Sequence, residues 1–339
     1  MTSELPTPSQ VSSPSRKILI TGANGQLGQA LRATVPLGYR VIALDRHQLD
    51  ITHRTAVESF IDDLQPDWVI NAAAYTAVDR AESEPDLAFA VNGDAPGYLA
   101  AALAKTGGRL LHISTDFVFD GQASTPYPPD AVPNPINVYG ASKLEGEKAV
   151  QSHLGDQALI VRTAWVYDGI NRNFVTTMLR LMAEREEVRV VADQIGTPTA
   201  THTLATTLWQ GLAQDWQGIY HVTDAGVASW YDFAVAIQHC GRKLGLLERS
   251  IPVIPIMTTE FPTAAQRPAY SVLDKSRTWQ KGVADSRYEP EMICLAASLR
   301  IPQNHTAIQQ SRHKNTNPPS HWVKSLGVQL NQLYVDQTY

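Results

Sequence analysis

Short apolar runs alternate with amphipathic stretches along the first half of the chain. The runs have the length of buried strands and occupy residues 18–20, 40–44, 68–70, 109–113 and 158–161. Apolar residues recur at helical spacing in the stretches at residues 55–64, 87–104 and 139–150. This alternation predicts an α/β fold, a doubly wound, Rossmann-like parallel sheet with helices on both faces and ligands at the carboxyl ends of its strands.

The alternation becomes less regular beyond about Trp165. Residues 188–191 and 219–222 still have the pattern of strands, and we expect them to extend the same sheet. Residues 229–237 begin with a helix cap and continue as an apolar helix. We therefore expect a smaller, interleaved substrate-binding lobe beside the sheet. The expected boundaries are a dinucleotide-binding domain of residues 17–168 and 188–228 and a substrate lobe of residues 169–187, 229–281 and 320–339.

Two segments have too few apolar residues to form a core. Residues 1–16 are rich in Ser, Pro and Thr, lack the pattern of a signal peptide, and are expected to form a flexible tail. Residues 282–319 are rich in Gln, Asn, His and Ser, and are expected to form a polar, flexible insertion.

The composition narrows the class of protein. A hydrophobic content of 43% and a net charge of −5 indicate a soluble globular chain and argue against nucleic acid or an anionic membrane as its main partner. The two cysteines, Cys240 and Cys294, have no metal-ligand spacing, and with no apolar run of membrane-spanning length a reducing cytoplasm is expected. A small molecule is therefore the expected partner, and a homodimer is possible.

A glycine-rich loop joins the first strand to the first helix. Gly22, Gly25 and Gly28 follow the apolar run at residues 18–20 and precede helix-compatible residues. Glycines in this context let the backbone turn sharply and approach a pyrophosphate, which rests on the free N–H groups of the helix. The loop therefore predicts a dinucleotide site.

A tyrosine and a lysine lie four residues apart at the start of a predicted helix. This spacing places Tyr139 and Lys143 on one helical face, and a lysine ammonium beside a phenol is expected to lower the phenol pKa. Such a tyrosine can exchange a proton with a substrate oxygen, and the hydroxyl of Thr115 at a strand end could bind the same oxygen. Together with the glycine loop, the pair indicates an oxidoreductase site.

The cofactor preference is open at this stage. Asp45, at the end of the second strand, suits the ribose 2′-hydroxyl of NADH, whereas Arg46 suits the 2′-phosphate of NADPH. We expect both cofactors to be accepted, with NADPH modestly better.

These motifs resemble the extended short-chain dehydrogenase/reductases and, among them, the dTDP-4-dehydrorhamnose reductase family. The resemblance covers about residues 17–280 and includes TGANGQLG, NAAAYTAVDRAESEP, ISTDFVFDG, NVYGASKLEGE, RTAWVY and RPAYSVLD. It implies reduction of the 4-keto group of dTDP-4-dehydro-L-rhamnose to dTDP-L-rhamnose, a precursor of cell-surface polysaccharide, with the tyrosine as proton donor.

The resemblance also implies roles for individual residues. Thr115, Tyr139 and Lys143 would form the catalytic triad. Val78, Thr115, Asp116 and Trp165 would contact the substrate. The residues expected to contact the cofactor are Gly22, Gly25, Gln26, Leu27, Gly28, Asp45, Arg46, Asp50, Ile51, Ala74, Tyr75, Thr76, Tyr139 and Lys143.

The chain departs from the family pattern at three places. Phe117 replaces a frequent tyrosine, so one polar contact to the substrate is in doubt. Ala30 occupies the position of a glutamate that helps some members to bridge a dimer through a metal, and we therefore expect no metal site. Residues 282–319 separate two segments that are nearly adjacent in the family.

Two other functions are compatible with the motifs. One is another nucleotide-sugar reductase, or an epimerase with the same Tyr and Lys, which would retain its NAD tightly. The other is a non-catalytic NADP-binding regulatory subunit, like the regulatory beta subunit of methionine adenosyltransferase. A turnover assay separates this subunit from an enzyme.

Overall fold

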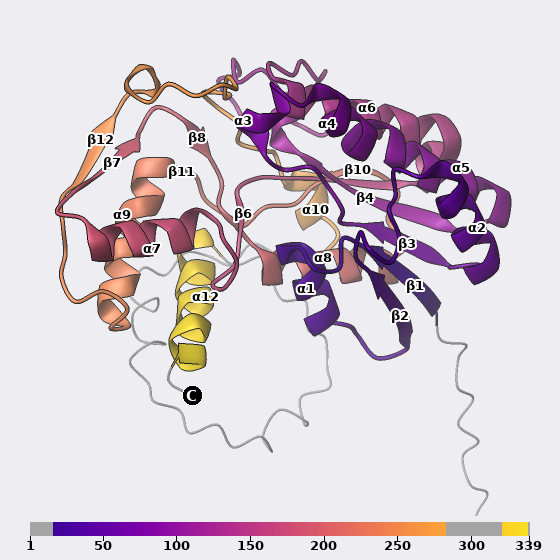
Figure 1. The fold of residues 1–339 in the computed structure, drawn as a ribbon, viewed down its shortest axis with the longest axis horizontal. Coiled ribbons are helices and arrows are strands. Elements are labelled where there is room, and N and C mark those ends of the chain that lie inside the picture. The colour runs from indigo at the N-terminus through magenta and orange to yellow at the C-terminus, as the bar shows by residue number, and fades with distance from the viewer. Residues whose placement is uncertain (1–15, 283–320, 338–339) are drawn as a thin grey trace, which may run out of the picture.

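The computed structural model describes residues 16–282 and 321–337 of the chain. The expected tail of residues 1–16 therefore lies outside the described residues except for Arg16, and the expected insertion of residues 282–319 lies outside them except for Gly282. Figure 1 shows a sheet with helices above and below it, and beside it a smaller lobe that contains the C-terminal helix.

The large sheet has six strands, all parallel, in the order β10-β5-β4-β3-β1-β2. Strand β1 lies between β2 and β3, so the strand order reverses beside it, which is where doubly wound sheets open a crevice for ligands. The arrangement confirms the expected fold class. The strands are β1 (Arg16–Thr21), β2 (Tyr39–Leu44), β3 (Trp68–Asn71), β4 (Arg109–Thr115), β5 (Leu159–Thr163) and β10 (Gly218–His221).

Alternate side chains of the strands enter two separate hydrophobic cores. Ile18 and Ile20 of β1 pack with α1 and α8, whereas Leu19 packs with α2, α5 and α6 on the opposite face. The period of two thus places helices on both faces of the sheet, as Figure 1 shows. These helices are α1 (Gln26–Ala33), α2 (Arg54–Leu64), α5 (Ala95–Thr106), α6 (Val138–Leu154) and α8 (Thr201–Ala213).

The helix expected at residues 87–104 is interrupted. It consists of α4 (Pro85–Phe89), a π-helical turn η1 (Ala90–Asp94) and then α5. A short helix, α3 (Val78–Ala81), precedes it. π-Helical turns inside helices are frequent at functional sites, and this one contains the buried Asn92.

The smaller lobe has its own hydrophobic core, which contains Phe233, Trp322 and Leu326. Its elements are α7 (Phe174–Glu184), α9 (Trp230–Lys243), α12 (Trp322–Gln337), β7 (Val188–Val191) and β12 (Val253–Ile256). Short segments connect it to the sheet domain: β6 (Val166–Tyr167), β8 (Ile195–Gly196), β9 (Thr199–Ala200), β11 (Ala228–Ser229) and α10 (Ser276–Trp279).

The expectation that residues 188–191 extend the large sheet is wrong. They form β7, which pairs in parallel with β12 in a separate two-stranded sheet. Val188 and Val190 pack in the core of the smaller lobe, and an apolar pattern indicates a strand without indicating its partner. The matching expectation for residues 219–222 is confirmed, because β10 pairs with β5 at the edge of the large sheet.

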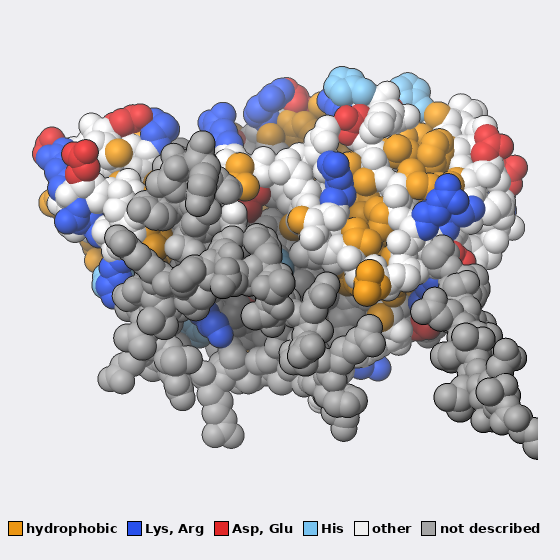
Figure 2. All heavy atoms as spheres, turned by 90° about the horizontal axis from the view of Figure 1, so that it is seen from below, with side chains coloured by type: hydrophobic (Ala, Val, Ile, Leu, Met, Phe, Trp, Pro, Cys, Tyr) orange, Lys and Arg blue, Asp and Glu red, His pale blue; other side chains and the backbone are white. Residues whose placement is uncertain are grey.

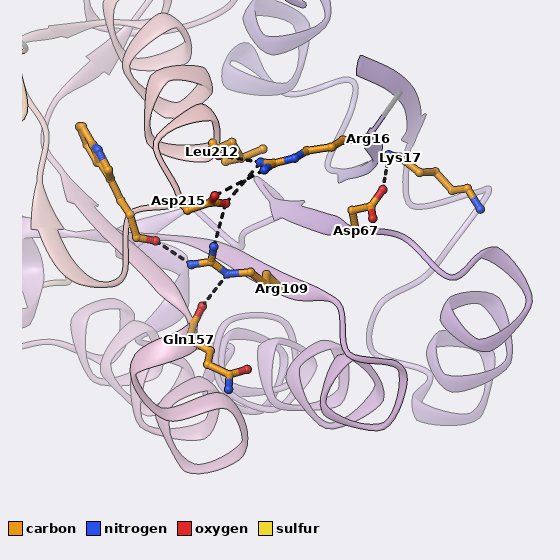
Figure 3. Close-up of polar contacts among 8 residues, drawn as sticks. Arg16, Lys17, Asp67, Arg109, Gln157, Leu212 and Asp215 are labelled. Carbon is orange, nitrogen blue, oxygen red and sulfur yellow. Dashed lines mark hydrogen bonds and ion pairs between the residues drawn. The ribbon is translucent and has the colours of Figure 1, made fainter. Parts of the chain in front are cut away.

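Polar contacts fasten the amino ends of the strands, away from the expected ligand edge. Arg16 at the start of β1 and Arg109 at the start of β4 both bind the carboxylate of Asp215, with N–O distances of 3.3 and 3.0 Å. Figure 3 also shows the backbone N–H of Lys17 donating to Asp67. This edge of the sheet is therefore tied together by side chains, and the carboxyl edge is available for ligands.

Where described atoms are visible in Figure 2, Lys and Arg lie interspersed with Asp and Glu. Within residues 16–282 and 321–337, no helix is long and apolar enough to cross a membrane.

A buried carboxyl group lies where the sheet domain meets the C-terminal helix. Asp224 accepts a hydrogen bond from the backbone N–H of Ala200, at 3.1 Å, and the next residue, Ala225, pairs with His321 ahead of α12. Burial raises the pKa of Asp224 to about 7, although hydrogen bonds, first that of Ala200, oppose the shift.

Asp224 makes stability dependent on pH. Between about pH 4 and 7 the folded chain holds a proton that the unfolded chain has released, so the free energy of unfolding falls as pH rises through this window. We expect Asp224→Asn to flatten the fall in melting temperature between about pH 4 and 7. The exposed Asp63→Asn serves as control and should keep the wild-type profile. An unchanged profile in Asp224→Asn would contradict the assignment.

Candidate active site

The loop between β1 and α1 has the geometry of a phosphate-binding turn. Gly22 has a φ of +72°, a region that favours glycine. A Cβ on Gly28 would lie 2.2 Å from the carbonyl oxygen of Gly22, so α1 can approach the turn only with glycine there. Helix α1 begins after Gly25 without a side-chain cap, which leaves its first N–H groups free to bind a pyrophosphate.

Two adjoining cavities contain all the expected site residues except Gly28. The first, of about 620 Å³, is termed the cofactor cavity, and the second, of about 490 Å³, the catalytic cavity. Gly25 and residues 72–74 line both, so the cavities meet at the glycine loop and the end of β3. The cofactor cavity is lined by Gly22, Asp45, Arg46, Asp50, Ile51, Ala74 and Tyr75, and the catalytic cavity by Gln26, Leu27, Thr76, Val78, Thr115, Asp116, Tyr139, Lys143 and Trp165.

The two residues that bear on cofactor preference lie at the outer end of the cofactor cavity. The carboxylate of Asp45 accepts hydrogen bonds from Asn24 Nδ2, at 2.8 Å, and from the backbone N–H of His47, at 2.9 Å. Arg46 is exposed, and its charge is among the weaker causes that lower the pKa of Asp50, after the hydrogen bonds from Thr52. The Asp45 carboxylate is thus hydrogen-bonded within its own loop, whereas Arg46 is an exposed side chain that lines the cavity.

Helix α6 places the buried side chain of Lys143 beside the carboxyl end of β4. The side chain of Asn137 caps the helix by accepting from the N–H of Gly140 at 2.7 Å. One turn later, Lys143 Nζ donates to the carbonyl oxygen of Ile113 at 2.6 Å. Burial lowers the pKa of Lys143 to about 8, and the charge of Glu147 opposes the shift.

Burial disfavours the ionised form of Tyr139. Burial raises its pKa to about 12, the charge of Asp116 adds to the shift, and a hydrogen bond with Thr115 opposes it. The sequence-based expectation was a lowered pKa through Lys143. Here desolvation, which disfavours the phenolate, is the larger effect. Burial therefore favours the neutral phenol, which is the form that can donate a proton.

Thr115 and Asp116 complete the polar side of the catalytic cavity. The hydroxyl of Thr115 donates to Asp116 Oδ1 at 3.0 Å and accepts from the N–H of Phe117 at 3.2 Å. Burial raises the pKa of Asp116 to about 6. The ring of Phe117 contacts Tyr139 edge-on, with 5.7 Å between ring centroids. The phenylalanine thus supports the tyrosine by packing against its ring.

A buried ion pair fixes α6 against the sheet. Glu147, one turn beyond Lys143, binds the guanidinium of Arg162 on β5 at 2.7 and 2.9 Å, and both side chains are 2% exposed. Ser114 on β4 donates to the same carboxylate. The helix that carries Tyr139 and Lys143 is therefore joined to two strands through one charged group.

Sequence reasoning missed a group of residues that line or support the cavities. Asn92, in the π-helical turn, accepts from the N–H of Tyr75 and donates to its carbonyl and to Ser142, at 2.9 to 3.1 Å. It holds the loop after β3 against α6. The one signal in the sequence was an asparagine within a largely apolar helical stretch. Such a residue is expected to be buried and to need hydrogen-bond partners.

Arg267 and Trp230 also line the catalytic cavity and were not expected there. Arg267 makes two parallel hydrogen bonds, of 3.0 and 2.8 Å, with the carboxylate of Asp79 next to Val78. Both residues come from segments distant in sequence, so no local pattern places them at the site.

The class of protein follows from the fold and the site together. The fold is a Rossmann-like sheet with a glycine turn, and the adjoining cavity holds Tyr139, Lys143 and Thr115. This combination defines a nicotinamide-dependent oxidoreductase of the extended short-chain type. A family model described as "RmlD substrate binding domain" matches residues 16–297. The chain belongs to the dTDP-4-dehydrorhamnose reductase family, which confirms the family indicated by the motifs.

Individual relatives agree with this assignment. The dTDP-4-dehydrorhamnose reductase of Burkholderia thailandensis is 45% identical over 268 residues, covering 76% of this chain and 90% of the relative. The enzyme of the same name from Aggregatibacter actinomycetemcomitans is 44% identical over 273 residues, with 78% and 92% covered. The crystal structure of the Bacillus anthracis dTDP-4-dehydrorhamnose reductase, solved in complex with NADP, has a TM-score of 0.78 at 34% identity and covers 94% of this chain and 99% of its own.

The ion pair of Glu147 provides a test of how α6 is held. Glu147→Gln should lower the free energy of unfolding by about 3–5 kcal/mol, because it leaves the charge of Arg162 buried without its partner. Glu145→Gln, on the same helix but in an exposed pair with Lys148, should change it by less than about 0.5 kcal/mol. Denaturant unfolding of both variants measures the difference, and equal effects would refute the role of the buried pair.

Proposed function

We propose that the chain reduces the 4-keto group of dTDP-4-dehydro-L-rhamnose to dTDP-L-rhamnose with NADPH. The observation that carries the proposal is that Thr115, Tyr139 and Lys143 line one cavity, which meets the cofactor cavity at Gly25 and residues 72–74. A sugar carbonyl beside Tyr139 would then lie next to the cofactor end of the site. The names of the similar proteins support the same substrate.

The residues of the cofactor cavity fit a dinucleotide. The turn at Gly22, the close approach at Gly28 and the uncapped start of α1 suit a pyrophosphate, and Asp50 and Ile51 suit the adenine side. NADPH, when bound, supplies the hydride. The protein's contribution is to orient the two ligands and to provide the proton.

Tyr139 is the proposed proton donor. As negative charge develops on the sugar oxygen, the phenol transfers its proton to that oxygen, and the hydroxyl of Thr115 hydrogen-bonds it. Lys143, fixed by the carbonyl of Ile113, places its positive charge near the phenolate that remains. Asp116 and Val78 lie where they can contact the sugar.

Turnover with defined substrates tests the proposal. We expect oxidation of NADPH with dTDP-4-dehydrorhamnose and a product whose NMR spectrum is that of dTDP-L-rhamnose. Turnover of a different keto sugar instead would indicate a related reductase. Tightly held, stoichiometric NAD in the purified protein, with interconversion of sugar epimers, would indicate an epimerase. Cofactor binding without any turnover would favour a regulatory subunit.

Replacing the phenol tests the proton donor. Tyr139→Phe should lower kcat by about 10²–10⁴-fold, because a positioned general acid contributes this much. The affinity for NADPH, measured by fluorescence titration, should change little. Tyr98→Phe, on α5 and outside both cavities, is the matched control. Retention of more than half of the wild-type activity by Tyr139→Phe would refute its role.

Arg46 tests the preference for NADPH. A charge-assisted contact to the 2′-phosphate contributes about 1.5–3 kcal/mol, so Arg46→Ala should reduce the NADPH/NADH affinity ratio about ten- to a hundredfold. Arg40→Ala, an exposed arginine on the same strand β2, should leave the ratio unchanged. Titration of both cofactors measures this ratio. Parallel changes of less than about threefold for the two cofactors would show that Arg46 does not bind the phosphate.

A further inference from the structure

Trp165 is held in an unfavourable backbone conformation at the edge of the catalytic cavity. It follows β5 and has a φ of +45°, which is uncommon for a residue with a bulky side chain and costs free energy. Its carbonyl oxygen accepts a hydrogen bond from the N–H of Thr199 at 3.1 Å. Such a conformation persists only where the surroundings determine it, so the contacts of the side chain matter.

The indole of Trp165 has two close neighbours. The ring of Trp230 stacks on it with 3.6 Å between ring centroids and 7° between ring planes. Gly196 approaches so closely that a Cβ there would lie 2.6 Å from the indole. Any rotation of the Trp165 side chain therefore has to separate it from Trp230.

Trp230 is itself firmly placed in the smaller lobe. It is the first residue of α9, directly after Ser229, whose side chain and that of Asp232 form a capping box. Its ring packs against Phe174 of α7, with centroids 4.6 Å apart. Both tryptophans line the catalytic cavity, so the stack joins the end of β5 to the smaller lobe at the site itself.

We propose that Trp230 is a positioning residue for the sugar nucleotide, acting through Trp165. The stack holds the Trp165 indole in its binding orientation before the substrate arrives. The sugar therefore binds without the cost of ordering a side chain. This inference rests on the proposed function, because it assumes that the ligand of the catalytic cavity is a sugar nucleotide.

The prediction concerns KM rather than kcat. Trp230→Leu should raise KM for dTDP-4-dehydrorhamnose about three- to tenfold, since immobilising one large side chain on binding costs about that much affinity. The kcat should change by less than about twofold, because the groups that handle the proton lie on α6 and β4. The dissociation constant for NADPH should stay unchanged. Trp230→Phe keeps a ring on Trp165 and should recover most of the loss.

Gly196→Ala tests the position of the Trp165 indole through its second close neighbour, Gly196. The added Cβ would displace the Trp165 ring, and KM should rise as in Trp230→Leu. Because both changes act through one side chain, the double variant should be no worse than the poorer single variant. Trp279→Phe, a tryptophan outside both cavities, is the control and should match wild type.

The outcomes separate this inference from the proposed function. Absence of turnover by the wild type would refute the function. With an active wild type, an unchanged KM in both Trp230→Leu and Gly196→Ala, or additive effects in the double variant, would overturn the positioning role. A parallel loss of NADPH binding in Trp230→Leu would show general damage to the fold and would overturn it as well. If Trp230→Leu fails to fold, Trp230→Phe and Gly196→Ala decide by the same criteria.

Discussion

The site depends on the contact between helix α6 and the sheet, at the buried pair of Glu147 and Arg162. Removing two charges from water is costly, and the pair persists because the carboxylate also accepts from Ser114. This arrangement fixes the helix against β4 and β5 at once. The same carboxylate acts on Lys143 one turn away and partly offsets the desolvation of its ammonium. The Glu147 carboxylate therefore both holds α6 against the sheet and stabilises the charged form of Lys143.

The topology determines where the two ligands meet. In a parallel sheet whose order reverses beside β1, the loops after β1 and β3 diverge and leave a crevice between them. The cofactor and catalytic cavities share the lining of this crevice, at Gly25 and residues 72–74. The Asn92 side chain, in the π-helical turn, then fixes the loop after β3 through hydrogen bonds to the backbone N–H and carbonyl of Tyr75. This shared lining is where the two cavities adjoin.

The features that were predictable from the sequence are the local ones. The strands, the turn at Gly22 and the spacing of Tyr139 and Lys143 follow from short-range patterns, and the structure has them within a few residues of their expected positions. The features that were missed depend on partners distant in sequence. The pairing of β7 with β12 and the stack of Trp230 on Trp165 are of this kind. No residue pattern within one segment encodes such a partner.

The pKa of Tyr139 is another property that the sequence alone did not predict. The spacing to Lys143 suggested a phenol that ionises readily, but a neighbouring charge and the loss of solvent act in opposite directions, and only the packed site shows which is larger. Here burial dominates for both residues: it raises the pKa of the phenol to about 12 and lowers that of the ammonium to about 8. A protonated phenol suits the reduction of a ketone, in which the oxygen must gain a proton. The reverse reaction needs a phenolate, which the same burial disfavours. The desolvated site thus favours the neutral phenol, the form that can give its proton to the ketone oxygen during reduction.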